Sequence, residues 1–104
     1  ADLLSANEGK VRSVKRYADE LCITPKYLSF VSKTVTGKTA LEWIHQSTVK
    51  SIERYLSHSN MSIKEIADIL EFPNLSFFGK FTKSHLGVSP TEYRRQQSMK
   101  KNNL

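Results

Sequence analysis

The sequence has little of what stabilises secreted or membrane proteins. Cys22 is the only cysteine among 104 residues, so a disulfide framework is impossible and a reducing cytoplasm is the expected location. No apolar run approaches membrane-spanning length, and no secretory signal is visible. The 4 glycines do not form a glycine-rich phosphate loop. These absences argue against a disulfide-stapled secreted domain, an integral membrane protein and a P-loop enzyme.

Acidic residues are also in deficit, because 10 Asp and Glu stand against 16 Lys and Arg, for a net charge of +6. This balance is expected of a protein whose partner carries phosphates, although a merely soluble basic surface is the alternative. The length allows one compact domain and little else. The chain begins at Ala1 without a methionine and already in helical pattern, so we expect a piece of a longer protein; a tag remnant or processing would give the same start.

No catalytic or metal-binding constellation stands out. The histidines His45, His58 and His85 lack cysteine or carboxylate neighbours at metal-ligand spacing, and His85 is expected to be partly buried at a helix end. Cys22 is typical of an ordinary small apolar residue. We therefore expect no enzyme activity, no metal and no cofactor.

Helix start and stop signals divide the chain into about seven helices, and nothing in it is typical of a strand, so the expected fold class is all-α. Capping boxes begin at Thr39, Ser62 and Ser89, each with a glutamate three residues later. The helices are expected over about 2–7, 13–21, 24–35, 40–57, from 62, 74–87 and from 89. Past Tyr93 the apolar residues run out, and the segment is expected to fray into a basic tail.

Two stretches of the chain are near-copies of each other. Residues 13–21 match residues 62–70 at an offset of 62 − 13 = 49, and one inserted residue later the offset is 50, as for Gly37 and Gly87. Each copy has the pattern helix, short turn, helix, and two such units can reach two successive turns of a DNA major groove. The expected organisation is a single DNA-binding region over 1–104. Its parts are a first helix-turn-helix at about 13–37, a linker helix at about 39–58, a second helix-turn-helix at about 62–87, and a C-terminal helix with a basic tail at 89–104.

The second helix of each copy, at about 24–35 and 74–86, is the candidate recognition helix. A helical wheel places one set of residues on the core side: Tyr27, Leu28, Val31, Ser32 and Val35 in the first helix, and Phe77, Phe78, Phe81, Thr82 and His85 in the second. It places the other set outward: Lys26, Ser29, Phe30 and Lys33, and Ser76, Gly79, Lys80 and Lys83. Entry into a major groove requires such a face of short, polar or cationic side chains.

The polar members of this face have alternative partners. Lys26 and Lys80 could each donate to guanine or to a phosphate, and Ser29 and Ser76 could bond a base edge or a phosphate. The remaining pair, Lys33 and Lys83, is equally consistent with phosphate contact and with a solvated charge.

Two further residues are unusual on an outward face. Phe30 is unfavourable in water unless something covers it; a thymine methyl is a suitable partner, and the alternative is packing against the other half of the domain. Gly79 inside a helix costs about 1 kcal/mol relative to alanine. Its presence is explained either by close approach of the backbone to DNA or by tight packing against a neighbouring helix.

With the repeat in place, the chain closely resembles the C-terminal DNA-binding domain of AraC/XylS-family transcription regulators, from about Arg12 to Arg95. The most specific motifs are Ser62-Ile63-x-Glu65-Ile66-Ala67, Phe72-Pro73-Asn74-x-Ser76-Phe77-Phe78-x-Lys80 and Lys83-x-x-x-Gly87-Val88-Ser89-Pro90-x-Glu92-Tyr93-Arg94. Residues 17–29 are similar to the first half of the same domain. The resemblance implies seven helices, with two helix-turn-helix subdomains joined by a linker helix over about 40–57.

The resemblance also implies that the third and sixth helices read adjacent major-groove segments. Carried over by position, the base-facing set is Lys26, Ser29, Phe30, Leu75, Ser76, Gly79 and Lys80. The expected partners are double-stranded DNA, RNA polymerase and an N-terminal sensing or signalling domain that is not present in this chain.

The chain departs from the family pattern at three places. Ser32 and Thr82 stand where a large apolar residue is usual, so either the cores are locally underpacked or the hydroxyls bond back to the helix backbone. Glu71 replaces a usual glycine, which predicts a different backbone conformation in that turn. Thr48-Val49 stands where an Arg-Leu pair is common, which puts an arginine–carboxylate anchor in doubt.

Two other binding functions are alternatives. A basic helical protein-interaction module could dock on an acidic partner such as a polymerase subunit, but it would not need an outward face that occurs twice. RNA binding is disfavoured because a deep, narrow A-form groove would not admit these helices. The phenylalanines at 77, 78 and 81 are also expected largely on the core side, unlike an exposed stacking platform.

Overall fold

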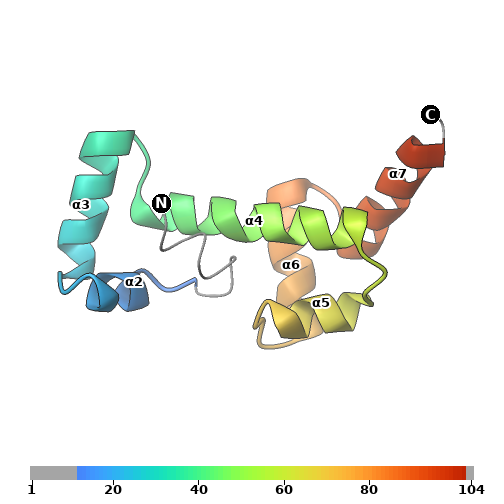
Figure 1. Ribbon diagram of the computed structural model, residues 1–104, viewed down its shortest axis with the longest axis horizontal. Coiled ribbons are helices and arrows are strands. Elements are labelled where there is room, and N and C mark those ends of the chain that lie inside the picture. The colour runs from blue at the N-terminus through green and yellow to red at the C-terminus, as the bar shows by residue number, and fades with distance from the viewer. Residues whose placement is uncertain (1–11, 103–104) are drawn as a thin grey trace. The chain divides into compact units, whose positions relative to one another are not determined.

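The computed structural model describes residues 12–102, and this range is all-helical, without a strand. Its helices are α2 (Val14–Glu20), α3 (Pro25–Thr36), α4 (Ala40–His58), α5 (Ile63–Ile69), α6 (Leu75–Leu86) and α7 (Pro90–Asn102) (Figure 1). The all-α prediction is confirmed, and the expected helix over 2–7 lies outside the described residues. The chain forms two compact units, Ala1–Thr48 and Val49–Leu104, with the boundary inside α4. No helix in the described range combines the length and the apolar character needed to cross a membrane.

Side-chain caps begin the helices where the sequence predicts them. Thr24 Oγ1 accepts from the Tyr27 amide at 3.1 Å, and Asn74 Oδ1 accepts from the Phe77 amide at 2.8 Å. The recognition-helix candidates α3 and α6 then end at Gly37 and Gly87, whose φ angles of 82° and 83° lie in the left-handed region. Both helices therefore begin at a side-chain cap of the third amide of the helix and end at a left-handed glycine.

Two of the three expected capping boxes are complete. Ser62 Oγ accepts from the Glu65 amide at 3.0 Å while Glu65 Oε1 accepts from the Ser62 amide at 2.9 Å, and Thr39 with Glu42 does the same. These hydrogen bonds hold the pKa values of Glu42 and Glu65 below the ordinary range. At the third box Ser89 Oγ accepts from the Glu92 amide, but the Glu92 carboxylate is paired with Arg95 instead.

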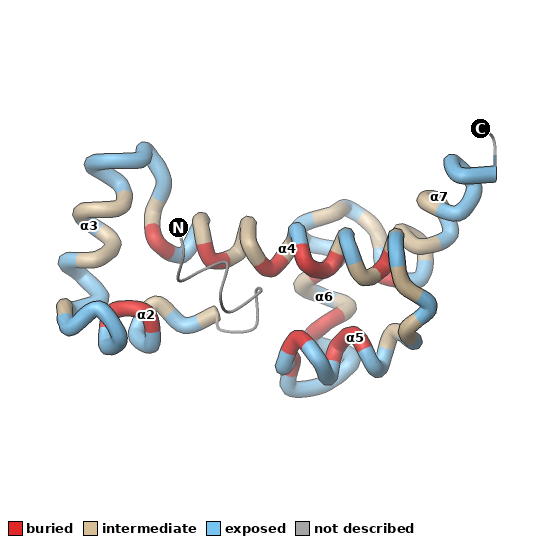
Figure 2. The backbone as a smooth tube through the Cα atoms, in the orientation of Figure 1, coloured by how far each residue is buried: buried red, intermediate tan, exposed pale blue. Residues whose placement is uncertain are grey.

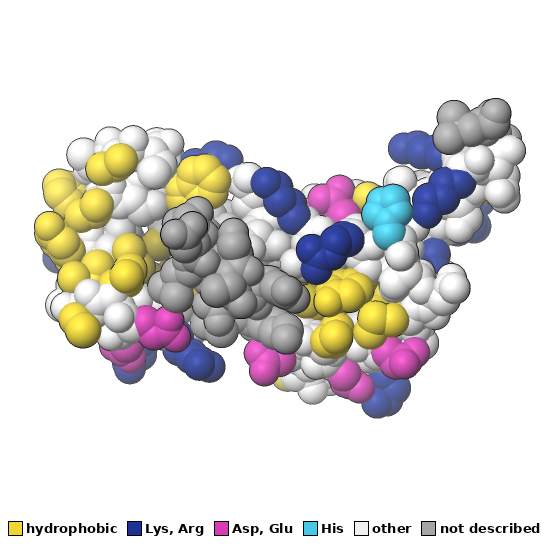
Figure 3. Space-filling model, viewed as in Figure 1, with side chains coloured by type: hydrophobic (Ala, Val, Ile, Leu, Met, Phe, Trp, Pro, Cys, Tyr) yellow, Lys and Arg dark blue, Asp and Glu magenta, His cyan; other side chains and the backbone are white. Residues whose placement is uncertain are grey.

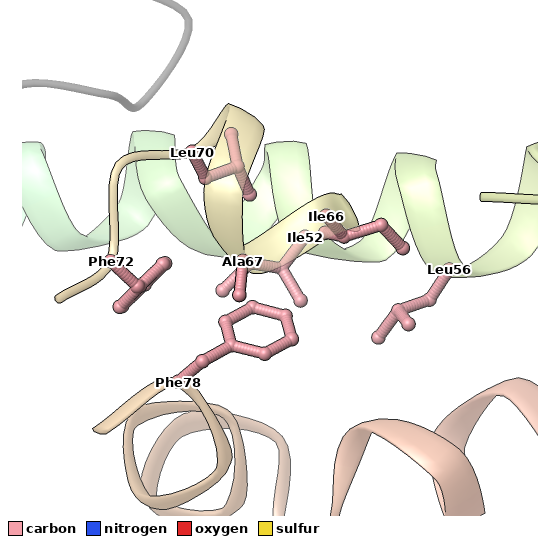
Figure 4. Packing of buried hydrophobic residues seen from close by; sticks show 7 residues of the cluster. All are labelled: Ile52, Leu56, Ile66, Ala67, Leu70, Phe72 and Phe78. Carbon is pink, nitrogen blue, oxygen red and sulfur yellow. The ribbon is translucent and has the colours of Figure 1, made fainter. Parts of the chain in front are cut away.

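The second unit is organised around one apolar cluster. Its buried members are Ile52, Leu56, Ile66, Ala67, Leu70, Phe72 and Phe78. Figure 4 shows Phe78 projecting from α6 toward Ala67 of α5 and Ile52 of α4. The Phe72 and Phe78 rings meet edge to face, with centroids 5.0 Å apart. This cluster fixes α6 against α4 and α5.

The first unit has a smaller described core. Tyr17 and Ala18 of α2 and Ala40, Ile44 and Thr48 of α4 are buried, whereas no residue of α3 is (Figure 2). Thr48, at the position where the anchoring arginine was in doubt, donates its hydroxyl to the Ile44 carbonyl oxygen at 3.2 Å.

The helical wheel placed four residues on the core side that the structure leaves exposed. Tyr27 is 56% exposed, Val35 is 75% exposed and Phe77 is 50% exposed, and His85 is also exposed. These residues lie near the two ends of α3 and α6. Each of these helices has 12 residues, whereas α2 and α5 have 7 residues each and are too short to cover both ends. The helical wheel correctly predicted the core-facing residues in the middle of each helix and was wrong for those near the helix ends.

The turn before each recognition helix contains a non-glycine residue in the left-handed region. Cys22 has φ 59° and Glu71 has φ 62°, and the two are equivalent in the repeat. The prediction that Glu71 changes the turn conformation is therefore wrong, because Glu71 takes the backbone conformation that a glycine would take.

Helix α7 corrects a second expectation, since it continues to Asn102 instead of fraying after Tyr93. Arg94 donates to the carbonyl oxygens of residues 55, 56, 59 and 61, and Lys101 donates to the carbonyl oxygen of Ser57. The segment is also rich in Arg, Gln, Met and Lys, which favour helix. Tertiary hydrogen bonds and helix propensity thus replace the missing apolar residues.

Candidate nucleic-acid interface

The outward faces of α3 and α6 carry no carboxylate. Neither helix contains Asp or Glu, and each has a lysine in its last turn, Lys33 and Lys83. On α2 and α5 the nearest repeated acids are already paired, as Lys15–Asp19 at 2.9 Å and Lys64–Asp68 at 3.2 Å. A phosphate approaching either recognition helix therefore meets lysines on a helix that has no carboxylate of its own. Glu42 of α4 is the one carboxylate of the described residues whose pKa is lowered by a lysine of these helices, since the charge of Lys33 adds to the larger effect of the hydrogen bonds with Thr39.

On α3 the expected site residues lie along one exposed side. Lys26 and Lys33 are exposed, Ser29 is half-buried, and Phe30 is 66% exposed. Lys26 takes part in none of the ion pairs of the described residues, so its ammonium is available for an acceptor on a partner. The exposure of Phe30 leaves most of its ring available for contact with a partner.

On α6 the corresponding residues are Leu75, Ser76, Gly79, Lys80 and Lys83. Leu75 is 48% exposed, and Ser76, Lys80 and Lys83 are exposed. A Cβ atom built on Gly79 would have no heavy atom of the described chain within 4 Å. Tight packing against a neighbouring helix therefore does not explain this glycine, and close approach of a partner remains as its explanation.

The C-terminal end of α3 is fastened to α4 by polar contacts that the sequence did not reveal. Trp43 Nε1 donates to Thr36 Oγ1 at 2.7 Å, and the Lys38 ammonium lies 4.7 Å from the centroid of the Trp43 ring. Ser32 donates its hydroxyl to the Lys38 carbonyl oxygen at 2.7 Å. These contacts orient α3 within the first unit although none of its residues is buried.

The two hydroxyls at equivalent core positions differ in their environment. The Ser32 hydroxyl finds an acceptor just beyond the end of α3, whereas Thr82 is fully buried and its Oγ1 has no hydrogen-bond partner in the described chain. Thr82 therefore contributes an uncompensated polar atom to the core of the second unit.

Arg94 is the most consequential residue that sequence reasoning left without a role. Its guanidinium donates to Leu56 O at 3.1 Å, Met61 O at 2.6 Å, Tyr55 O at 3.2 Å and Ser59 O at 3.3 Å. It thereby closes the C-terminal end of α4 and fixes α7 to it. The only signal in the sequence was its presence in the Glu92-Tyr93-Arg94 motif.

No group of three His, Cys, Asp or Glu residues in the range 12–102 is placed to hold a metal ion. The raised pKa of Tyr93, caused by burial and by the neighbouring Glu53 carboxylate, belongs to the α4–α7 packing and not to the outward faces.

The chain is similar to known helix-turn-helix proteins over most of its length. A family profile described as a helix-turn-helix domain matches residues 17–96. Regulatory protein PocR of Salmonella typhimurium is 32% identical over 79 residues, which are 76% of this chain and 26% of that protein. The arabinose operon regulatory protein of Escherichia coli is 26% identical over 77 residues, which are 74% of this chain and 26% of that protein. The chain thus spans about a quarter of the length of these two relatives.

Solved structures share the fold. The DNA-binding domain of the transcriptional factor AdpA, in complex with a target DNA, has a TM-score of 0.79 and 21% identity over 91% of this chain and 86% of that one. The C-terminal domain of the response regulator AraT from Geobacillus stearothermophilus has a TM-score of 0.81 and 23% identity over 91% and 79%. The chain belongs to the AraC/XylS family of transcription regulators and corresponds to the helix-turn-helix DNA-binding domain of that family.

Proposed function

We propose that this domain binds double-stranded DNA in a sequence-specific manner to regulate transcription, with α3 and α6 each entering a segment of the major groove. The observation that carries the proposal is the duplicated outward face. Both recognition helices begin at a side-chain cap and end at a left-handed glycine, and both lack carboxylates. Lys26 and Ser76, Phe30 and Lys80, and Lys33 and Lys83 occupy equivalent positions in the repeat and are exposed. A protein that reads two successive groove segments needs this duplication.

The residues take different roles within that interface. Lys26, Ser29 and Phe30 on α3 and Leu75, Ser76, Gly79 and Lys80 on α6 face the bases, with Phe30 against a thymine methyl and the lysines toward guanine acceptors. Lys33 and Lys83, in the last turns, contact phosphates. Phe30 and Lys80 are equivalent in the repeat but chemically different, so the two helices prefer different bases.

Selection from random duplex DNA, read by sequencing, tests the proposal directly. We expect a site of two half-elements about one helical turn apart, in direct order, because the protein repeat is head to tail. A domain without salt-dependent binding to any duplex would contradict the proposal.

Two lysine variants separate base reading from phosphate contact. Lys80→Ala should weaken binding to the selected site by about 1–3 kcal/mol and reduce the base preference at one base pair. Lys83→Ala should weaken binding to all DNA sequences alike, and it should reduce by about 1 the slope of the logarithm of the binding constant against the logarithm of the salt concentration. If Lys80→Ala weakened binding to the selected duplex and to random duplexes equally, as expected for Lys83→Ala, Lys80 would not be a base-reading residue.

In the cell we place this domain in the cytoplasm, working with RNA polymerase and with an N-terminal sensing or signalling domain. The support is that several relatives are named as operon regulatory proteins and are about three to four times longer than the matched region. Transcription in vitro from a promoter carrying the selected site, with purified polymerase, measures the polymerase dependence.

A further inference from the structure

A row of basic side chains on α4 has no part in the proposed DNA interface. Lys50, Arg54 and His58 follow one another at four-residue intervals, and all three are exposed. Residues four apart lie on the same side of a helix, one above the other, about 6 Å apart along the axis. We call these three residues the α4 stripe.

None of the stripe residues takes part in an ion pair of the described chain. The Arg54 guanidinium lies 5.0 Å from the centroid of the Tyr55 ring, which restricts its motion without neutralising it. Glu53 is the one carboxylate in the second half of α4, and it is half-buried and accepts from the Tyr93 hydroxyl at 3.1 Å. Lys50 and Arg54 therefore carry positive charges that no ion pair of the described residues neutralises.

The C-terminal end of α4 reinforces this charge instead of opposing it. A helix C-terminus normally carries about half a negative charge on its free carbonyl groups. Here Arg94 and Lys101 donate to those carbonyl groups, and each adds a full positive charge. Figure 3 shows Lys and Arg side chains over α4 and α7 of the second unit, with a His side chain and an acidic side chain among them.

The stripe faces away from the proposed DNA contact of the same unit. Lys50 and Arg54 each lie two residues from the buried Ile52, which places them about 160° around α4 from the core. Lys80 lies two residues from the buried Phe78 and so about 160° around α6 from the same core. Ile52 and Phe78 meet in one cluster (Figure 4). The cationic face of α4 and that of α6 therefore each point away from this cluster and are separate faces of the unit.

We propose that the α4 stripe docks an acidic helical segment of a partner protein while α6 occupies DNA. Glutamates at four-residue intervals on a partner helix repeat every 6 Å or so, the same interval as the stripe. The duplex read by α6 meets a different face of the unit, so we assign the charge complement of the stripe to a different molecule. The inference concerns a surface separate from the DNA interface and goes beyond the proposed function.

The probe is a synthetic alanine-based helical peptide with glutamate at every fourth position. Titrated into the whole chain, it should perturb the backbone amide NMR signals of residues 50, 54 and 58. The control peptide has the same composition with its glutamates spread around the helix, and it should bind at least about fivefold more weakly because only the first peptide aligns its charges.

Charge reversal then separates the two surfaces. The double variant Lys50→Glu, Arg54→Glu should lose at least about tenfold in peptide affinity and keep its affinity for the selected duplex within about threefold. The matched control, Lys26→Glu with Lys33→Glu, has the same change of net charge and should lose DNA binding but keep the peptide. The neutral pair Lys50→Gln, Arg54→Gln should show an intermediate loss of peptide binding and circular dichroism equal to that of the wild type.

Three results would overturn the proposal. The first is equal binding of the two peptides to the wild type, and the second is equal binding of the aligned peptide by the wild type and by the Lys50→Glu, Arg54→Glu variant. The third is a loss of DNA affinity in that variant at least as large as the loss in the Lys26→Glu, Lys33→Glu control. The last result would make the stripe a DNA contact. Failure of the chain to bind any duplex would contradict the DNA-binding proposal and leave the peptide comparison intact.

Discussion

Gly79 is the fifth residue of α6, and a Cβ built there would meet open space. Alanine at this position should therefore raise the free energy of unfolding by about 1 kcal/mol, because alanine favours helix over glycine. The same methyl group would lie between α6 and the floor of the groove, so affinity for the selected duplex should fall at least about tenfold. Urea denaturation and fluorescence anisotropy measure the two effects.

Ser84→Ala on the same helix is the control for Gly79→Ala, since Ser84 is exposed and outside the base-facing set. Its DNA affinity should stay unchanged. Gly79→Ala with unchanged DNA affinity would remove close approach as the reason for the glycine.

Cys22 keeps a side chain at a φ of 59°, where L-residues are strained by about 1 kcal/mol. Cys22→Gly should therefore be more stable than Cys22→Ala by about 1 kcal/mol, because alanine retains the Cβ and glycine does not. Trp43 is the only tryptophan and lies in the same unit, so its fluorescence during urea unfolding reports this difference. Equal stability of the two variants would mean that the turn relaxes its backbone.

Thr82 buries a hydroxyl that has no partner in the described chain. Valine has nearly the same shape, so Thr82→Val should stabilise the fold by about 1–2 kcal/mol by removing the unsatisfied group. Thr48→Val is the matched control, since the buried Thr48 hydroxyl donates to Ile44 and its removal should give no stabilisation. Thermal unfolding followed by circular dichroism compares the two; a destabilised Thr82→Val variant would indicate a partner such as a buried water.

At the scale of elements, α7 depends on Arg94 for its attachment to α4. Arg94→Lys keeps the charge but cannot reach four carbonyl groups with one ammonium, so it should cost about 2–3 kcal/mol of stability. Arg94→Ala should cost at least as much. Far-ultraviolet circular dichroism in urea measures both, and a lysine variant as stable as the wild type would show that charge alone fixes α7.

The helix boundaries were predictable because their determinants are local. Thr24-Pro25, Ser62 with Glu65, and Gly87 each act within a few residues of the helix end they define, and the structure uses all of them. The extent of α7 was not predictable in this way, because Arg94 finds its acceptors 33 to 39 residues earlier in the chain. Patterns within a few residues of a helix end cannot predict hydrogen bonds to residues that are distant in the sequence.

The outward faces of the candidate site could likewise be predicted from the period of the helix, but the ends of the core stripes could not. Tyr27 and Val35 share a side with the half-buried Leu28 and are exposed nonetheless. A helical wheel gives the direction of a side chain and not the length of the helix that covers it. The base-facing roles themselves remain predictions.

At the scale of the whole molecule, the two recognition helices occupy equivalent places in the repeat but expose different side chains. Phe30 on α3 is equivalent to Lys80 on α6, so an asymmetric DNA site is expected. Replacing one half-element of the selected site by an inverted copy of the other makes the site a palindrome and should lower affinity at least about thirtyfold, because several bases then meet the wrong side chains. Competition binding with the two duplexes measures this.

Equal affinity for the direct and palindromic sites would show that one helix supplies the specificity alone. A Phe30→Ala variant distinguishes the cases, because it should weaken binding only if α3 reads bases.

The turn that carries Cys22 has a practical consequence. The thiol is the only one in the sequence and is exposed, and it lies two residues before the cap of α3. A maleimide fluorophore or spin label would attach there without any substitution, beside the proposed groove contact. The molecule thus offers a built-in attachment point from which quenching or line broadening on DNA addition can be followed in real time.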